Sequence, residues 1–324
     1  MVDLAVPSIS AIVATRNRAG LLAQTLDALV GQTWPRERLE IIVADNGSSD
    51  NTRELVEGLA RRPGAPVVRY IYVAEPGKSN AVNAALSVAH GELLAFTDDD
   101  VLPEPTWLAQ LASAFVDPAV DFAAGRILPR WESDPPSWLS RALYGPLSVN
   151  DNGEQRLAIG AGERDDVMAQ GGNMAVRATV IARLGGLRTD LGSLHGTLRN
   201  GEDHEFFLRM RYAGCQGIYE PTALVRHWVA RDRLTPAYFR RWLYENGRDV
   251  ARLESSYPLP VSRLLGVPRY LWREAAVNAY RALRFALGGD RPSGFAAALR
   301  VLWFGGYIRE AWLGKMAGTF GTRV

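Results

Sequence analysis

The sequence contains a single cysteine, Cys215, among 324 residues. One thiol can build neither a disulfide framework nor a zinc site of the cysteine type, so a reducing compartment is expected. Net charge is nearly absent as well, because 37 Lys and Arg residues stand against 35 Asp and Glu residues and leave a formal charge of +2. Without a strong positive field, a nucleic-acid partner is not expected.

Long apolar runs are also missing. A membrane-spanning helix needs about 20 mostly apolar residues, and the apolar stretches near the C-terminus are interrupted by arginines such as Arg281 and Arg300. The first apolar stretch follows Asp3 and no basic segment, so no secretion signal is expected. With 47% hydrophobic residues the chain can still bury a sizeable core. We therefore expect a cytoplasmic protein, soluble or peripheral on the cytoplasmic face of the membrane.

Two common phosphate-binding motifs are absent. The first apolar stretch is followed by TRNRAG, where a dinucleotide-binding loop needs GxGxxG. The segment PGKS at 76–79 resembles the end of a P-loop, but Tyr72 stands where that loop needs a glycine. A dinucleotide site and a P-loop site are therefore both excluded.

Short β-rich runs alternate with helical patterns in the first half of the chain, as is typical of βαβ units around a parallel sheet. The predicted strands are 8–15, 39–45, 67–73, 92–100 and 120–127, and the predicted helices include 19–30, 79–89, 104–115 and 178–184. Residues 217–228 are expected to form two strand-like pieces. The predicted fold class is α/β, with a mostly parallel, Rossmann-like central sheet flanked by helices and a helical C-terminal extension.

Polar side chains stand where these predicted strands end: Thr15, Asp45, Glu75 and Asp98. In open α/β sheets ligands bind beyond the carboxyl ends of the strands, so we expect these side chains to share one crevice. Three consecutive acids, Asp98 to Asp100, would repel one another unless a cation were present. Mg²⁺ prefers carboxylate and diphosphate oxygens, which predicts a metal-bridged diphosphate. Taken alone, the triplet could also be a solvated acidic turn.

Seven motifs follow one another between Ser8 and Trp228: SISAIVATRNR, VADNGSSD, EPGKSNAVNAAL, FTDDD, GGN, GEDHEF and RHW. As a set they resemble the family-two inverting glycosyltransferases of the GT-A fold. The resemblance implies a catalytic domain over 1–228, with nucleotide-sugar binding in about 1–128 and acceptor binding and the catalytic base in 129–228. Residues 229–324 would form the helical C-terminal extension.

The resemblance implies a nucleotide-diphosphate sugar as donor, with a UDP-sugar as the first expectation. It places Thr15, Arg16 and Asp45 at the nucleobase and ribose, where the Asp45 carboxylate can accept a hydrogen bond from a uracil or guanine N–H. Lys78 would reach the base or the diphosphate as a point charge. Taken alone, this residue is equally consistent with a solvated lysine at the start of a helix.

The same resemblance implies Mn²⁺ or Mg²⁺ as cofactor, held by the acidic triplet in one of two registers. In the first register Asp99 is the metal ligand. In the second, Asp98 contacts the ribose and Asp100 binds the metal. His227 in RHW matches a late histidine that ligates the metal in some family members, and a structural role is the alternative.

The acceptor side is expected at two motifs. GEDHEF resembles the acidic motif of the family, so Asp203 would be the general base that deprotonates the acceptor for a single inverting displacement. Glu202, Gly172 and Asn173 are expected to contact the acceptor, the glycine by permitting close backbone approach and the asparagine through its amide. Helix capping for Glu202 and Asp203, and a simple turn for GGN, are the alternatives.

Charge is concentrated in the last 62 residues, where ten basic and three acidic residues give +7 and leave −5 for residues 1–262. Aromatic and aliphatic residues alternate there with arginines. Such helices could lie on an anionic membrane surface, which would suit a glycan or lipid-linked acceptor. They could equally cover the catalytic domain or form a homodimer.

Three function classes remain open from the sequence. Transfer of a sugar to a glycan or lipid-linked acceptor, in polysaccharide or glycoconjugate biosynthesis, is the first. A sugar-phosphate nucleotidyltransferase is the second, but it should carry a Gly-rich basic loop where TRNRAG has one glycine. A non-catalytic nucleotide-binding interaction domain is the third, and it would not require the acids at the strand ends.

Overall fold

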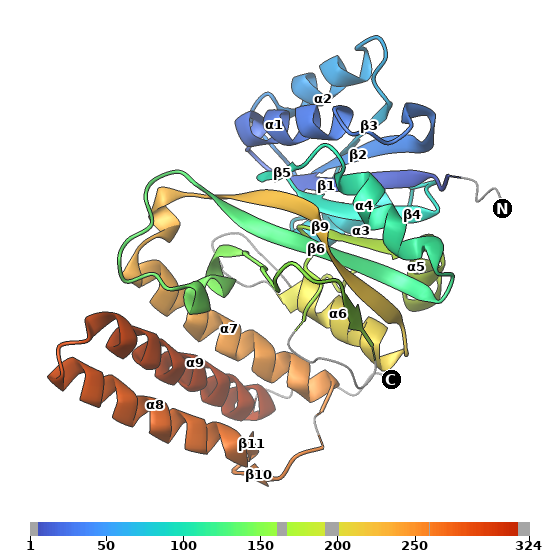
Figure 1. The fold of residues 1–324 in the computed structure, drawn as a ribbon. Helices are drawn as coiled ribbons and strands as arrows, with labels where there is room; N and C mark the ends of the chain where they lie inside the picture. Colours follow the sequence, from blue (N-terminus) through green and yellow to red (C-terminus); the bar gives the residue numbers. More distant parts are fainter. Residues whose placement is uncertain (1–5, 161–166, 192–200, 259, 317–324) are drawn as a thin grey trace. The chain divides into compact units, whose positions relative to one another are not determined.

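The computed structural model describes residues 6–160, 167–191, 201–258 and 260–316 (Figure 1). The N-terminal segment with Asp3, on which the expectation about a secretion signal rests, lies outside these residues. The chain divides into two compact units. The first unit comprises residues 1–130, 148–195 and 202–228, and the second comprises 131–147, 196–201 and 229–324.

A nine-stranded sheet organises the first unit (Figure 1). Its order is β3-β2-β1-β4-β8-β6-β9-β5, with β7 beside β9. The strands are β1 (Ile9–Thr15), β2 (Leu39–Asp45), β3 (Val67–Tyr72), β4 (Leu93–Asp98), β5 (Val101–Pro103), β6 (Val120–Trp131), β7 (Leu157–Ile159), β8 (Met174–Arg177) and β9 (Gln216–Val229).

The helices of the first unit connect these strands. They are α1 (Ala19–Val30), α2 (Thr52–Ala60), α3 (Lys78–Leu86), α4 (Trp107–Ser113), α5 (Ala178–Leu184) and α6 (Gly201–Tyr212), with short 3₁₀ turns η1 (Arg36–Arg38) and η2 (Ala114–Val116). The predicted α/β fold is confirmed, with parallel strands β3, β2, β1 and β4 in one half of the sheet and helices at the C-terminus.

Both faces of the central strands are buried, which explains their nearly continuous apolar sequences. Successive residues of β1 contribute to two different cores: Ala11 and Val13 pack with residues of α1, α2 and α4, whereas Ile12 packs with residues of α3, α5 and α6. Strands β1, β2, β3 and β4 run parallel, and β8 is antiparallel to both β4 and β6. The parallel set therefore places the ends of β1, β2 and β4 at one edge of the sheet.

The expectation of two strand pieces over 217–228 is wrong, because β9 is one continuous strand. Pro221 lies between Gly217–Tyr219, which pairs with β7, and Val225–His227, which pairs with β5. A residue without an N–H is compatible with the strand there, because neither β7 nor β5 pairs with it.

The second unit is helical, with α7 (Pro236–Ser256), α8 (Arg269–Leu287) and α9 (Arg291–Met316). It also contains the 3₁₀ turns η3 (Arg141–Leu143), η4 (Gly145–Leu147) and η5 (Arg231–Arg233) and a small hairpin of β10 (Arg263–Leu264) and β11 (Val267–Pro268). Thr235 caps α7 by accepting a hydrogen bond from the Tyr238 N–H. Residues 131–147 belong to this unit because the ring of Trp138 packs edge-to-face on Phe239 and Phe295.

Helix α9 lies between α7 and α8 and approaches α7 closely through two glycines (Figure 1). A Cβ on Gly247 would overlap the Trp303 carbonyl oxygen, and a Cβ on Gly306 would overlap that of Tyr244. Glu310 of α9 accepts hydrogen bonds from Arg248 (2.9 Å) and Arg252 (2.5 Å) on α7. The two glycines thus set the spacing at which these ion pairs can form.

Replacing Gly306 with alanine should destabilise the protein by about 1–3 kcal/mol, because the new methyl group meets backbone and one helix must shift. Gly305 is the matched control. A Cβ there meets nothing within 4 Å, so Gly305→Ala should be neutral or stabilise the helix by up to about 1 kcal/mol. Urea unfolding of both variants measures the difference. Equal stability of the two variants would contradict this account of the α7–α9 contact.

Candidate active site

The structure brings three of the four predicted strand-end residues, Thr15, Asp45 and Asp98, together at one edge of the sheet, whereas Glu75 lies three residues beyond the end of β3. Thr15 is in register with Asp45 on β2, and Ala14 is in register with Asp98 on β4. The acids Asp98, Asp99 and Asp100 follow at the end of β4, where Asp99 is 5% exposed and Asp100 is 8% exposed. Carboxylates buried to this degree require partners, which the neighbouring elements supply.

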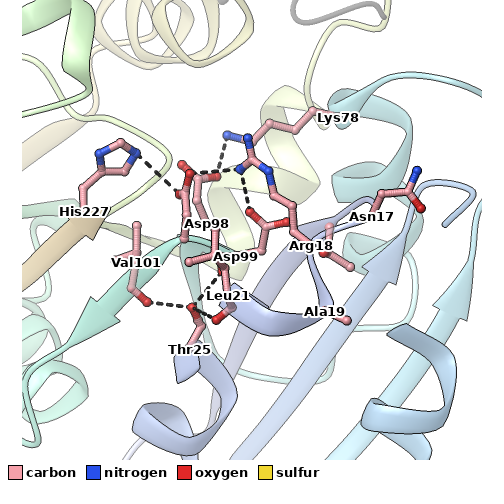
Figure 2. Close-up of polar contacts among 12 residues, drawn as sticks. Asn17, Arg18, Ala19, Leu21, Thr25, Lys78, Asp98, Asp99, Val101 and His227 are labelled. Atoms are coloured by element: carbon pink, nitrogen blue, oxygen red, sulfur yellow. Dashed lines mark hydrogen bonds and ion pairs between the residues drawn. The ribbon is translucent and has the colours of Figure 1, made fainter. Parts of the chain in front are cut away.

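Arg18, at the start of α1, is the main partner of two of these acids (Figure 2). Its Nη1 lies 3.0 Å from Asp99 Oδ1 and 2.9 Å from Asp100 Oδ2. Thr15 donates its hydroxyl to the other Asp99 oxygen at 2.8 Å. Burial, together with the adjacent Asp100, still raises the pKa of Asp99 to about 6, because Arg18 and Thr15 offset only part of the cost. Oxygens of two acids therefore converge on a single cationic nitrogen.

The backbone around the acids is fixed from two sides. The Thr25 hydroxyl of α1 lies 3.0 Å from the Asp99 carbonyl oxygen and 2.8 Å from that of Val101. On the other side β5 pairs with β9 in the register Val101 to His227. This pairing brings His227 to the acids, with its Nε2 3.5 Å from Asp100 Oδ1 (Figure 2).

Lys78, the first residue of α3, lies between Asp98 and the first turn of α6. Its Nζ is 2.7 Å from Asp98 Oδ1 and 3.7 Å from Asp203 Oδ2. Burial alone would lower the pKa of Lys78, but Asp203, Asp98 and Glu202 outweigh burial and hold it well above its ordinary value. Burial would raise the pKa of Asp98, and Lys78 reverses this so that the pKa is lowered. Both groups are therefore charged at neutral pH.

Asp203 is held against the loop that precedes β8. The Gly171 N–H donates to Asp203 Oδ2 at 3.2 Å. A Cβ on Gly171 would lie 2.6 Å from an Asp203 oxygen, so only glycine permits this approach. A Cβ on Gly172 would lie 3.2 Å from Asp98 Oδ2. The paired glycines thus allow the backbone to lie beside both acids.

A small cavity of about 10 Å³, with room for about one water molecule, lies beside Lys78. Lys78, Asp98 and Asp203 contribute to its lining. The rest of the lining is mainly apolar and includes Ile12, Ala14, Val82, Phe96, Met174 and Leu187. The group of charged side chains therefore adjoins the apolar core at this point.

Glu202 is buried beside this group of charges, with 2% of its surface exposed. No side chain or backbone group among the described residues hydrogen-bonds to its Oε2. Burial, and next the charge of Asp203, raise the pKa of Glu202 to about 8, although Lys78 opposes them. The carboxyl group is therefore largely protonated at neutral pH and can donate a hydrogen bond.

Asp45 is 1% exposed, and both of its carboxylate oxygens are engaged. Oδ1 accepts from the Ser48 N–H at 2.8 Å, and Oδ2 accepts from the Tyr70 hydroxyl at 2.8 Å. A nucleobase N–H would have to share or replace the Tyr70 hydroxyl. Arg16, also expected at the base, is half-buried at the end of β1.

The interpretation of Asn173 as an acceptor contact does not agree with its geometry. Its side chain is 1% exposed, and both amide hydrogens are used, by the carbonyl oxygens of Arg126 (3.0 Å) and Ala223 (2.7 Å). Its Oδ1 accepts from the Trp107 indole at 2.7 Å. The amide therefore cross-links the sheet and α4, and this is the correction to the sequence-based expectation.

Two site residues escaped the sequence-based reasoning. Arg18 is directed at the acids because Asn17 adopts a left-handed backbone conformation (φ +51°), which asparagine tolerates well. Asn46 was not among the predicted site residues, yet its side chain forms hydrogen bonds with the backbone of Val73, Glu75 and Gly77 and so fixes the loop before Lys78. The available signal was an asparagine close behind each of two buried strands, Asn17 two residues after β1 and Asn46 directly after β2.

The sequence model of the family described as "Glycosyl transferase family 2" matches residues 10–185 of this chain. The chain belongs to glycosyl transferase family 2. Of the three function classes left open by the sequence, this membership selects the glycosyltransferase, an enzyme that uses nucleotide-sugar donors.

Two relatives illustrate the range of the family. The succinoglycan biosynthesis protein ExoM of Rhizobium meliloti is 29% identical over 287 residues, which cover 87% of this chain and 81% of ExoM. The pre-mycofactocin glycosyltransferase of Mycobacterium tuberculosis is 27% identical over 233 residues. That match covers 69% of this chain but only 45% of the relative.

Solved structures share the fold of this glycosyltransferase. The mannosyltransferase PcManGT of Pyrobaculum calidifontis, in complex with GDP-Man and Mn²⁺, matches with a TM-score of 0.64 at 20% identity and covers 94% of this chain and 87% of its own. TarS 1–349 of S. aureus, in complex with UDP, matches with a TM-score of 0.54 at 16% identity and covers 91% and 90%. At these identities the likeness establishes the GT-A-type fold.

Replacing Glu202 with glutamine should change how stability depends on pH. In the unfolded chain this carboxyl ionises near 4.5, whereas the folded protein keeps its proton until about pH 8. Between these values a rise in pH favours unfolding, by up to about 1.4 kcal/mol per pH unit, because only the unfolded state releases the proton. Glu202→Gln should therefore gain stability relative to the wild type from pH 5 to pH 8, measured by thermal unfolding.

The same substitution at the exposed Glu54, Glu54→Gln, provides the control. A constant difference between Glu202→Gln and the wild type across this pH range would contradict the assignment of a buried, protonated carboxyl.

Proposed function

We propose that this glycosyltransferase moves a sugar from a nucleoside-diphosphate sugar, bound with Mn²⁺ or Mg²⁺, to a hydroxyl group of a glycan or lipid-linked acceptor, with inversion at the anomeric carbon. The observation that carries the proposal is the convergence of two sets of acids. The acids after β4 and Asp203 at the start of α6 lie on the two sides of Lys78, at 2.7 Å and 3.7 Å. In a single displacement the bound donor and the general base must lie next to each other, as these two sets of acids do.

The metal would be held by Asp99 and Asp100, with His227 as a further ligand. Oxygens of both acids lie within 3.0 Å of one Arg18 nitrogen, so one cation can contact both. Among the described residues no three Asp, Glu, His or Cys side chains form a metal site on their own. This agrees with the behaviour of Mg²⁺, which is usually bound by one or two carboxylates together with substrate phosphates. Carboxylate and imidazole donors also suit Mn²⁺.

The donor would lie along the strand ends. We assign Thr15, Arg16 and Asp45 to the nucleobase and ribose, and Asp98 to the ribose. Lys78 would neutralise Asp98 and the approaching diphosphate. A bound divalent cation supplies electrostatic stabilisation of the leaving diphosphate. PcManGT with GDP-Man and Mn²⁺ and TarS with UDP support a nucleoside diphosphate as the common element.

Asp203 would act as the general base. As the acceptor oxygen attacks the anomeric carbon, the bond from that carbon to the diphosphate oxygen breaks and the hydroxyl proton passes to Asp203. The Gly171 N–H and Lys78 orient its carboxylate. Glu202, protonated at neutral pH, can donate a hydrogen bond to an acceptor oxygen, and the backbone at Gly172 can approach the sugar. The match to ExoM, a succinoglycan biosynthesis protein, favours a glycan as acceptor.

Asp203→Asn should retain donor binding and lose transfer by a factor of about 10²–10⁴, because asparagine keeps the shape but cannot take a proton. Donor affinity is measured by calorimetry and transfer by release of the nucleoside diphosphate with a panel of acceptors. Asp134→Asn, at an exposed site, is the control. Normal transfer by Asp203→Asn would show that the base is another residue.

The register of the acidic triplet can be resolved by comparing Asp99→Ala with Asp100→Ala. The variant that removes the principal ligand should lose Mn²⁺-dependent nucleotide affinity by about tenfold more than the other, because an ionised metal ligand contributes more than its neighbour. Asp98→Ala should weaken nucleotide binding with and without metal alike. If all three bind nucleotide with Mn²⁺ as the wild type does, the acids hold no metal.

A further inference from the structure

The outward face of α8 in the second unit carries large apolar side chains that nothing described covers. Val277, Tyr280, Leu283 and Leu287 are 40%, 65%, 61% and 82% exposed. Their spacing of three or four residues places them on one side of the helix. The opposite side packs on α9, where Leu271 is 4% exposed. The exposed stripe is therefore the side of α8 that faces away from the core of its own unit.

Arginines are interleaved with this stripe. Arg273 and Arg284 follow the same spacing and are exposed. Helix α8 contains four arginines and one acid, Glu274, and within the described part of the chain none of these arginines forms an ion pair. Arginines on the inner side of α7 behave differently, since Arg248 and Arg252 both pair with Glu310. The outer face is thus apolar and carries positive charge that the fold leaves unneutralised.

We propose that this outer face of α8, defined by Arg273, Val277, Tyr280, Leu283, Arg284 and Leu287, docks on the surface of an anionic lipid bilayer. The apolar side chains enter the interface, and the arginines extend along it to the anionic headgroups. No helix in the described ranges is long and apolar enough to cross a bilayer. The proposal concerns attachment and does not depend on the transfer reaction at the strand ends.

The pattern favours a lipid surface over a protein partner. In a two-fold homodimer built on this face, each copy would present arginines and no acid from the defined face, so like charges would oppose association. Protein interfaces also gather apolar residues at the centre and charges at the rim. Here Arg284 lies between Leu283 and Leu287, so positive charge stands within the apolar stripe and not only at its rim. An extended surface of anionic headgroups complements this arrangement.

The experiment uses the full-length protein and sedimenting vesicles of phosphatidylcholine, either alone or with about 30 mol% phosphatidylglycerol. Two double variants test the apolar and the charged residues of the face separately. Leu283→Gln/Leu287→Gln removes apolar contacts, and Arg273→Gln/Arg284→Gln removes positive charge. The matched controls are Val67→Gln/Val116→Gln and Arg38→Gln/Arg61→Gln in the first unit, all at exposed positions. Thermal unfolding verifies that each variant is folded.

The wild type and both controls should bind the anionic vesicles and bind phosphatidylcholine alone at least about tenfold more weakly. Each α8 variant should lose about tenfold or more in partition onto anionic vesicles, while donor hydrolysis in solution stays unchanged. Binding should also weaken as salt is added. Failure of the transfer reaction would leave these results unaffected, so the two proposals fail separately.

The proposal is overturned if the wild type binds neither vesicle, or if both α8 variants bind as the wild type does. Light scattering gives an independent contradiction, because conversion of a dimer to a monomer by these variants, without vesicle binding by the wild type, would identify a homodimer interface. If a double variant does not fold, Leu287→Gln alone, at the last and most exposed position of the helix, is subjected to the same vesicle test.

Discussion

The pairing of buried carboxylates with Arg18 and Lys78 is the interaction on which the site depends. Four acids, Asp98 to Asp100 and Asp203, come from the end of β4 and the start of α6, and in such numbers they would repel one another strongly. Two cations from other elements separate them: Arg18 contacts Asp99 and Asp100, and Lys78 contacts Asp98 and Asp203. The arrangement keeps these negative charges close together at the strand ends, where they can bind a metal ion that also contacts a diphosphate.

Much of this site could be predicted from sequence because it follows from local patterns. The apolar runs of β1, β2 and β4 identify buried parallel strands, and parallel strands end at one edge, so Thr15, Asp45 and Asp98 had to be neighbours. Gly171 and Gly172 let the backbone lie close to Asp203 and Asp98, whereas contact of Gly172 with the acceptor stays a prediction. The roles assigned to these residues in the reaction stay predictions.

The remaining features depend on contacts between distant segments. The three-residue strand β5 is too short to be recognised, yet its pairing with β9 is what brings His227 to Asp100. The inward direction of the Asn173 amide depends on Trp107, 66 residues away. Residues 131–147 are attached to the second unit by the ring contacts of Trp138 and by the hydrogen bond from the Tyr238 hydroxyl to the Pro146 carbonyl oxygen. None of these contacts produces a repeating pattern of apolar and polar residues that could be recognised in the sequence.

The central claim is that the acids after β4 bind a metal ion jointly with a nucleoside diphosphate, and electron paramagnetic resonance of Mn²⁺ tests it most directly. The signal of free aqueous Mn²⁺ is followed with protein alone, with UDP or GDP alone, and with both. The account predicts that protein and one of the nucleotides together remove much more free Mn²⁺ than the two separate effects combined, because each supplies part of the coordination. Purely additive loss of the signal with both nucleotides would contradict it.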